Sequence, residues 1–311
     1  MPNWAGSCWY YLGYLLKQED GSYLPLDSKQ AYEIFKRWLP VDIYVGGQEH
    51  AVLHLLYARF WHHFLYDIGI VPTKEPFYRV INQGMILGPN GMKMSKSLGN
   101  VINPDDVVSS HGADSLRLYE MFMGPINSAF SWTEEGLNGV RKWLDRVYRF
   151  FEENHAKFGE TADSELNYAY NAFVKNVTHN IENFGFNVAI SDMMVFINAC
   201  YSAHKWSKKQ MQGFLVVLSC FAPHLAEELN QMLGDTLSIT KQKWPSFDEK
   251  ALIKKTFNLP VMVNGKLRDV VVVETNALEK AKNSEKIANF IKDKEIKKVI
   301  YVQNKILNII I

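Results

Sequence analysis

A short apolar run followed by paired glycines and a helix-forming stretch is the feature that most constrains the fold of this chain. Residues 41–45, Val-Asp-Ile-Tyr-Val, are β-branched or aromatic at all but one position and predict a buried strand. Gly46 and Gly47 interrupt this run, and a helical pattern follows from about Gln48 to Asp67. A strand, a glycine turn and a helix in this order form the unit from which parallel α/β sheets are built. The chain is therefore expected to contain part of an α/β domain.

The pattern changes after this unit. Residues 79–87 predict a second strand, Gly-Pro-Asn-Gly at 88–91 predicts a turn, and Asn103-Pro104 opens a short helix. From about residue 113 to 250 the apolar positions recur with helical spacing, which predicts an α-helical bundle. The expected helices are 115–123, 134–157, 164–183, 187–206 and 208–233.

The last part of the chain predicts a small α+β domain. Asn264-Gly265 is the strongest short signal for a β-hairpin, here between strands at 259–263 and 268–273. A helix at about 276–292 and two strands at 298–302 and 306–311 complete this part. The expected domains are therefore a partial α/β domain over 1–112, a helical bundle over 113–250 and a small α+β domain over 256–311, with a Lys-rich linker before the last.

Composition excludes several classes of protein. The 311 residues are 47% hydrophobic, enough to build a sizeable core and too many for a disordered chain. No apolar run reaches the roughly 18–20 residues of a membrane span, and the first residues do not resemble a signal peptide. Three widely spaced cysteines form neither a disulfide framework nor a metal-binding pair. We therefore expect a soluble, cytoplasmic protein with no membrane partner.

Charge is unevenly distributed along the chain. The formal net charge is +1, yet residues 251–311 carry +6 and residues 1–250 carry −5. A basic C-terminal segment indicates a polyanionic partner at that end, although a Lys-rich solvated surface would give the same count.

A glycine-flanked loop carries two lysines. Lys93 and Lys96 lie three residues apart in Gly-Met-Lys-Met-Ser-Lys-Ser-Leu-Gly-Asn, residues 91–100, with Ser95 between them. A lysine ammonium is a compact charge that can follow a phosphate group, and serine hydroxyls can donate hydrogen bonds to it. The loop would suit the charge that develops on pyrophosphate as it leaves ATP. Taken as two spaced lysines alone, it could equally be an ordinary exposed basic loop.

The segment that follows the first strand also offers ligand-binding groups. Gly46 and Gly47 would let a ligand approach the backbone at the start of a helix, and Glu49 could accept hydrogen bonds from sugar hydroxyls. His50 and His54 lie four residues apart and would share a helix face. They could form a zinc pair or remain neutral core histidines, and no third ligand at metal spacing accompanies them.

Longer strings resemble a known family. Lys93–Ser97 matches the KMSKS loop of class I aminoacyl-tRNA synthetases without a mismatch, and Tyr44–Phe60 closely resembles a segment of leucyl-tRNA synthetases. Residues 4–11 are similar to the aromatic strand that follows that family's editing insertion, and residues 83–86 to the strand whose backbone reads adenine. Residues 112–117 resemble the junction leading into the anticodon-binding bundle, and 263–268 with 297–302 resemble the C-terminal domain.

This resemblance implies roles at matching positions. The implied leucine pocket consists of Ser7, Tyr10, Tyr44 and His54, whereas Trp4, Trp9 and Tyr11 are expected in the core. The implied ATP and adenosine site consists of Gly46, Gly47, Glu49, His50, Gln83, Met85, Ile86 and Met94. The implied catalytic residues are Lys93, Ser95 and Lys96, which would stabilise pyrophosphate. Candidates for tRNA contact, which also suit a solvated face, are Arg141, Lys142, Arg146, Arg149, Lys297 and Lys298.

The implied function is ligation of leucine to tRNA(Leu) through leucyl-adenylate, with ATP and Mg²⁺ as substrate and no tightly bound cofactor or protein-held metal. The family's other phosphate motif, His-Ile-Gly-His, does not occur in the sequence. We therefore expect the chain to be the C-terminal half of a synthetase, as a truncation, a split-gene subunit or a fragmentary gene product. An N-terminal half or α subunit would then be its partner. The alternatives are a non-catalytic tRNA-binding module and a ligase for another branched amino acid, which residues 46–60 argue against.

Overall fold

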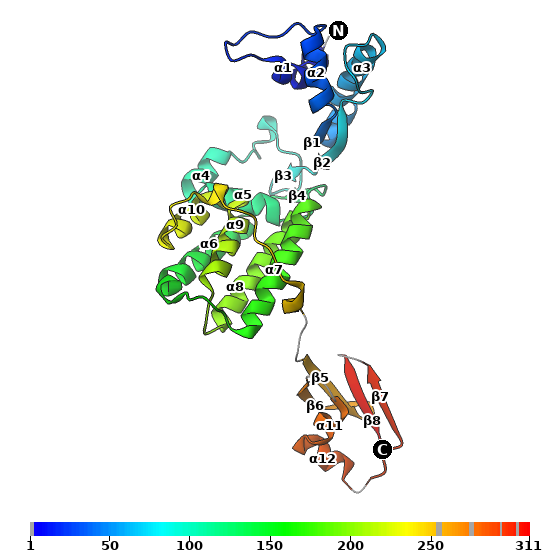
Figure 1. The fold of residues 1–311 in the computed structure, drawn as a ribbon, viewed down its shortest axis with the longest axis vertical. Coiled ribbons are helices and arrows are strands. Elements are labelled where there is room, and N and C mark those ends of the chain that lie inside the picture. Colours follow the sequence, from blue (N-terminus) through cyan, green and yellow to red (C-terminus); the bar gives the residue numbers. More distant parts are fainter. Residues whose placement is uncertain (1–2, 253–256, 274–276, 293, 303–304) are drawn as a thin grey trace. The chain divides into compact units, whose positions relative to one another are not determined.

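The computed structural model describes residues 3–252, 257–273, 277–292, 294–302 and 305–311 (Figure 1). Two compact units result, one formed by residues 1–162 and 173–245, the other by residues 163–172 and 246–311. No helix in the described ranges is long and apolar enough to cross a membrane. The predicted Lys-rich linker falls partly outside these ranges.

The first unit begins with an α/β part. Its elements are the 3₁₀ helix η1 (Asn3–Cys8), α1 (Tyr10–Leu16), α2 (Lys29–Trp38), β1 (Val41–Gly47), η2 (Gln48–Ala51), α3 (His54–Asp67) and β2 (Phe77–Gln83). Strands β1 and β2 are parallel, and α3 lies in the connection between them. Their register pairs Val41 with Phe77 and Gly47 with Gln83, so both strands end side by side. Leu12, Phe35 and Leu65 belong to the small core of this part.

Four predictions about this part need correction. Trp9, expected in the core, is 39% exposed. The strand at 41–45 exists, but Ile43 is 44% and Val45 43% exposed, because these residues, two apart, share one face of the sheet and that face is largely open to solvent. The helix expected from Gln48 is interrupted, since Leu53 has a non-helical backbone and α3 begins at His54. Residues 4–11 are helical rather than a strand, with Trp9 O accepting hydrogen bonds from the backbone of α1.

The next segment contains short secondary-structure elements. They are β3 (Ile86–Leu87), η3 (Lys96–Leu98), α4 (Pro104–His111) and β4 (Phe130–Ser131), with β3 and β4 parallel. The expected strand 79–87 divides at Gly84, whose amide donates to Ile126 O at 2.7 Å. A Cβ on Gly84 would lie 2.0 Å from Ser128 O, so only glycine allows this approach of the two chain segments. Asn103 caps α4 by accepting from the Asp105 amide, as its sequence predicts.

The helical bundle contains α5 (Ala113–Phe122), α6 (Glu134–Asn154), α7 (Ser164–Glu182), α8 (Phe186–Ser202), α9 (Lys208–Ser219) and α10 (Pro223–Met232), with the 3₁₀ turns η4 (His155–Lys157) and η5 (Ile239–Lys241). The predicted helices are confirmed except the last, which is two helices because Pro223 starts a new one. The rings of Phe151 and Phe196 both lie close to that of Phe214, with centroids 6.3 and 5.6 Å away. All three side chains are fully buried.

The second unit contains a four-stranded sheet. Its elements include η6 (Glu249–Leu252), β5 (Phe257–Val263), β6 (Lys266–Val273), α11 (Ala277–Lys282), α12 (Glu285–Ile291), β7 (Lys298–Val302) and β8 (Ile306–Ile310). The strand order is β6-β5-β8-β7, and only the β5–β8 pair is parallel. The predicted hairpin is confirmed, with Asn264 and Gly265 at φ of 50° and 76°. The expected single helix is two helices, and the predicted domain boundaries stay predictions.

Candidate active site

A buried histidine organises one cluster of predicted site residues. His54 lies at the start of α3, and its Nδ1 is 2.7 Å from Ser7 Oγ, which comes from η1. The rings of Tyr10, from α1, and Tyr44, from β1, lie beside the His54 ring, with centroids 5.6 and 5.8 Å from that of His54. The structure thus brings together the four side chains that the sequence assigns to a leucine pocket.

The hydrogen bonds around His54 define its tautomer. The Ser7 hydroxyl donates to Trp4 O at 2.8 Å, so its oxygen must accept the Nδ1 proton of His54. The other ring nitrogen, Nε2, then carries a lone pair, and the Tyr10 hydroxyl lies 3.5 Å away. Burial lowers the pKa of His54, and the neighbouring His50 lowers it further, so the imidazole stays neutral. His54 therefore presents a hydrogen-bond acceptor within an aromatic surround.

Two glycines at the carboxyl end of β1 leave room for side chains that fold back over them. A Cβ on Gly46 would lie 2.9 Å from the Tyr44 ring, and one on Gly47 would lie 2.3 Å from a carboxylate oxygen of Glu49. Burial and the Glu49 charge raise the pKa of Tyr44. Glycine at both positions therefore leaves the space that the Tyr44 ring and the Glu49 carboxylate occupy at the strand end, where parallel α/β sheets bind ligands.

His50 lies in η2 and not on α3, so the predicted shared helix face with His54 is wrong. Its ring meets that of Trp4 edge-on at 5.5 Å. His50 Nδ1 is enclosed by protein, and no hydrogen-bond partner for it lies among the described residues. Over those same residues, no group of three or more His, Cys, Asp or Glu could hold a metal ion. His50 Nδ1 is thus a buried polar atom without a described partner, and the zinc interpretation gains no third ligand.

The predicted adenine-contacting residues follow the second strand. Gln83 pairs in register with Gly47 at the ends of β1 and β2, which places it beside the glycine pair. Ile86 lies in β3 opposite Phe130, and Met85 O accepts from the Phe130 amide at 3.2 Å. Sequence reasoning gave Gly84 no role of its own, although its position inside a strand pattern was the available signal.

The lysine loop is held by its own polar side chains. A bridge pairs Leu87 with Lys93, so the loop begins at the end of β3. Ser95 caps η3, where its hydroxyl accepts from the Leu98 amide. Lys93 and Lys96 are exposed, Met94 is half-buried, and no described carboxylate lies within ion-pair distance of either ammonium. Both ammonium groups are therefore available to an anionic ligand.

The candidates for tRNA contact are partly engaged within the protein. On α6, Arg141 donates to His111 O and to Asp145, Arg146 donates to Asn198 and stacks on Tyr201, and Arg149 contacts a carbonyl of its own helix. Lys142 is exposed on the same helix. In the other unit, Lys297 and Lys298 are exposed at the start of β7. The arginines thus contribute to packing, which leaves their contact with tRNA a prediction.

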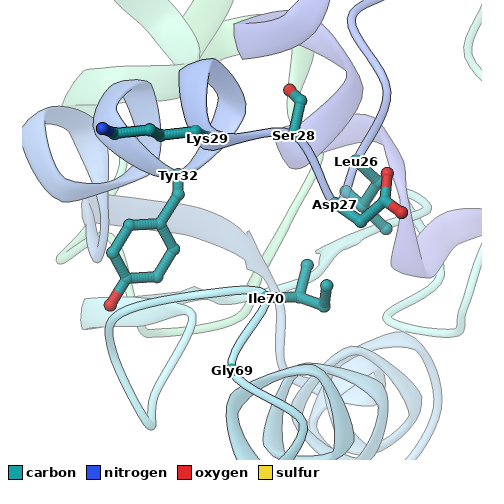
Figure 2. Close-up of a pocket in the computed structure, with 7 residues that line it drawn as sticks. All are labelled: Leu26, Asp27, Ser28, Lys29, Tyr32, Gly69 and Ile70. Carbon is teal, nitrogen blue, oxygen red and sulfur yellow. The ribbon is translucent and has the colours of Figure 1, made fainter.

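One hollow lies apart from these residues, at the start of α2 (Figure 2). It is lined by Leu26, Asp27, Ser28, Lys29, Tyr32, Gly69 and Ile70. The Lys29 ammonium and the Asp27 carboxylate extend away from each other there (Figure 2). None of the seven is a predicted site residue.

Comparison with known proteins supports the resemblance. Residues 24–133 match the class I tRNA synthetases specific for I, L, M and V, and residues 163–289 match the anticodon-binding domain of tRNA ligases. The leucine–tRNA ligase of Malacoplasma penetrans (strain HF-2) is 57% identical over all of this chain and 39% of the relative. That of Mesoplasma florum (strain ATCC 33453) is 51% identical over 100% of this chain and 39% of the relative.

A solved structure agrees. The ternary complex of Agrobacterium radiobacter K84 agnB2 LeuRS with tRNA and LeuAMS has a TM-score of 0.74 and 32% identity, over 99% of this chain and 42% of that one. These matches define a segment of a class I aminoacyl-tRNA synthetase with its helical anticodon-binding domain. Over its whole length the chain is similar to leucine–tRNA ligases, and it spans 39% to 40% of the length of the relatives compared.

Proposed function

We propose that this chain contributes the leucine pocket, part of the ATP site and the lysine loop to a leucine–tRNA ligase. The observation that supports this most is the cluster around His54 at the carboxyl end of β1, with Ser7, Tyr10 and Tyr44 converging on one imidazole. Aromatic rings around one neutral acceptor suit a small apolar substrate with a polar end. In this proposal His54 Nε2 accepts a hydrogen bond from the amino acid, and the rings enclose its side chain.

The chemistry of the first step assigns roles to the neighbouring groups. The leucine carboxylate attacks the α-phosphorus of ATP, forming leucyl-adenylate and releasing pyrophosphate. Glu49 and the backbone at Gly46 and Gly47 would hold the ribose, His50 the adenosine, and Gln83, Met85 and Ile86 the adenine. Lys93 and Lys96, with Ser95 and Met94 in the same loop, would neutralise the negative charge that grows on the leaving pyrophosphate. Mg²⁺ would arrive with ATP as part of the substrate.

The second step transfers leucine from the adenylate to a ribose hydroxyl of tRNA(Leu), with release of AMP. The helical bundle and the basic residues 251–311 would contact the tRNA, in line with the match to an anticodon-binding domain and the net charge of +6. A cytoplasmic location is part of the same proposal because ribosomes consume the product.

We further propose that another polypeptide segment completes the site. On α3, Leu56 and Phe60 lie four residues apart and are both exposed, Phe60 to 65%, and Val52, just before the helix, is 72% exposed. On the neighbouring sheet Tyr78 is 82% exposed. Apolar faces of this kind are normally covered in parallel α/β domains. A segment carrying the His-Ile-Gly-His phosphate motif would cover them and supply the second set of phosphate contacts.

The test is leucine-dependent ATP–pyrophosphate exchange, measured on the chain alone and together with the N-terminal half of a close relative. We expect leucine-dependent exchange only when both polypeptides are present. Exchange should be much slower when isoleucine, valine or methionine replaces leucine. The matched control is the mixture with Lys93→Ala and Lys96→Ala in this chain.

The alternatives give different results. A mixture that binds tRNA(Leu) but exchanges pyrophosphate with no amino acid would favour the non-catalytic tRNA-binding module. Exchange that responds better to isoleucine or valine would indicate a ligase for another branched amino acid. Full exchange by the chain alone would contradict the proposed need for a second segment.

A further inference from the structure

The side chain of Asn100 lies at the centre of the lysine loop. Its Oδ1 accepts a hydrogen bond from the Ser95 amide at 2.9 Å. Its Nδ2 donates to Lys93 O at 3.3 Å and to Asn90 Oδ1 at 3.2 Å. One amide side chain thus contacts three points of the loop. These partners also define its orientation, because a reversed amide would set its N–H groups against the Ser95 N–H.

We call these three hydrogen bonds, from Asn100 to Ser95, Lys93 and Asn90, the brace. Two further observations show that the brace spans the whole loop. Asn90 Oδ1 also accepts from the Met92 amide at 3.2 Å, so the two asparagines link the turn before the lysines to the residues after them. A Cβ on Gly88 would lie 2.8 Å from Asn100 Nδ2. Glycine at position 88 therefore leaves the space that the asparagine amide occupies.

We propose that Asn100 is a positioning residue that fixes the backbone of residues 93–95 and thereby aims Lys93 and Lys96. It does not touch the substrate. It binds the carbonyl of one lysine and the amide that precedes the other, so the two ammonium groups share one rigid support. Pre-positioned charge stabilises a transition state more than charge that must first be ordered. The link from Asn100 to catalysis rests on the proposed function, whereas the brace itself can be tested without it.

The first test uses limited trypsin digestion of the 311-residue chain, with cleavage after Lys93 and Lys96 followed by mass spectrometry. Asn100→Ala is expected to speed cleavage at these bonds on the order of tenfold, because the loop then opens more often. Asn100→Asp keeps the acceptor for the Ser95 amide but loses both N–H donors, so it should also speed cleavage. Asn103→Ala is the control, since Asn103 caps α4 nearby and makes none of these bonds. Equal cleavage of Asn100→Ala and the unchanged chain would overturn the brace.

The second test uses ATP–pyrophosphate exchange with the N-terminal half present. Asn100→Ala should lower kcat on the order of tenfold and leave the KM for leucine unchanged. In a chain that already carries both Lys93→Ala and Lys96→Ala, the same change should lower the remaining kcat less than about twofold, because both aimed groups are gone. Losses that multiply in the triple variant would show that Asn100 acts by general stability and would overturn the positioning role. If the unchanged mixture shows no exchange, the proposed function fails, and the trypsin comparison still decides the brace.

Discussion

The α/β part and the helical bundle belong to one compact unit, yet they bury their apolar residues very differently. The bundle encloses large aromatic side chains such as Phe151, Phe196 and Phe214 completely. The α/β part has a two-stranded sheet and exposes Phe60 and Tyr78 on its outer surfaces. The bundle therefore has a core of its own, whereas the α/β part presents the surfaces of a layered domain from which further layers are missing among the described residues.

This difference bears on function because the predicted leucine and ATP residues lie in the less enclosed part. His54 is buried within its own cluster, but the strand ends beside it belong to a sheet of two strands. A complete site needs groups on both sides of the substrate. The comparison between the two parts thus supports the proposal that another segment completes the site.

The largest expected effect compares one phenylalanine from each part. Phe214→Ala should lower the free energy of unfolding by about 3–5 kcal/mol, because it removes a ring packed against Phe151 and Phe196. Phe60→Ala should change it by less than about 0.5 kcal/mol, because that ring is mostly in solvent. Urea denaturation measures both, and hydrogen exchange in α9 locates the first effect. Equal losses for the two variants would remove the contrast between the parts.

Local signals accounted for much of the fold. Asn103-Pro104 and Asn264-Gly265 each contain a cap or turn whose geometry depends on neighbouring residues, and both appear as predicted. Gly84 and Leu53 show where such signals stop. The strand ends at Gly84 because the backbone of residue 128 approaches it, and the helix expected from Gln48 begins only after Leu53. Contacts between segments far apart in the sequence leave no pattern in a short window.

The candidate site was likewise predictable where a sequence motif marked it and not where it depends on contacts made by the folded chain. The motif resemblance named His54, Ser7, Tyr10 and Tyr44, and the structure brings these side chains together, although their roles stay predictions. Asn100 was missed because an asparagine after a glycine is typical of many turns. Its three hydrogen bonds become visible only when the loop is folded.

The second prediction concerns Lys96, which lies outside the cores of both the α/β part and the helical bundle. If the proposed function holds, Lys96→Ala lowers the pyrophosphate-exchange rate of the completed protein by roughly 10²–10³-fold, because the proposal assigns to this lysine one of the charges that stabilise the transition state. The melting temperature should stay the same, since Lys96 is exposed and unpaired among the described residues. Steady-state exchange kinetics and thermal unfolding measured on the same sample check both statements. A variant with full activity would place the lysine loop outside the reaction.

The third prediction uses a buried histidine that anchors the α/β part. His62 lies on α3, where its Nδ1 is 2.9 Å from the Tyr11 hydroxyl and its Nε2 is 3.0 Å from Thr73 O. The carbonyl can only accept, so Nε2 donates and Nδ1 accepts from the tyrosine. Burial lowers the pKa of His62 to about 4 from its usual 6.5. The imidazole therefore stays neutral in the folded chain at pH values where the unfolded chain binds a proton.

This difference predicts a pH window. The stabilisation is complete above the unfolded pKa of 6.5 and is lost as pH falls toward the folded pKa of about 4. The total is about 3 kcal/mol, because each pKa unit corresponds to about 1.4 kcal/mol. Urea denaturation at pH 7.5 and at pH 5 measures how far the free energy of unfolding falls between the two pH values. This fall should be smaller for His62→Gln than for the unchanged chain. An equal decrease in both would place the pH dependence on other groups.

The smallest expected effect comes from an ion pair on the surface of the α/β part. Arg59 of α3 donates two hydrogen bonds to Glu75, at 2.8 and 2.7 Å, and His63 Nε2 lies 3.2 Å from the same carboxylate. The Arg59 hydrogen bond is the main reason that the pKa of Glu75 falls to about 2 from 4.5. This stabilisation is present above pH 4.5 and is lost as pH falls through about 2.

Because both side chains are about half exposed, water screens the pair, and Glu75→Gln should cost no more than about 1 kcal/mol at pH 7. The cost should shrink in 1 M salt, where the screening length is about 3 Å. Glu33→Gln is the matched control, since Glu33 pairs with Lys36 one turn away on α2 and should cost less. Urea denaturation of both variants at low and high salt provides the measurement. A loss above about 2 kcal/mol for Glu75→Gln, unchanged by salt, would show that this surface contact supports the α/β part as a buried contact does, and would weaken the contrast with the bundle.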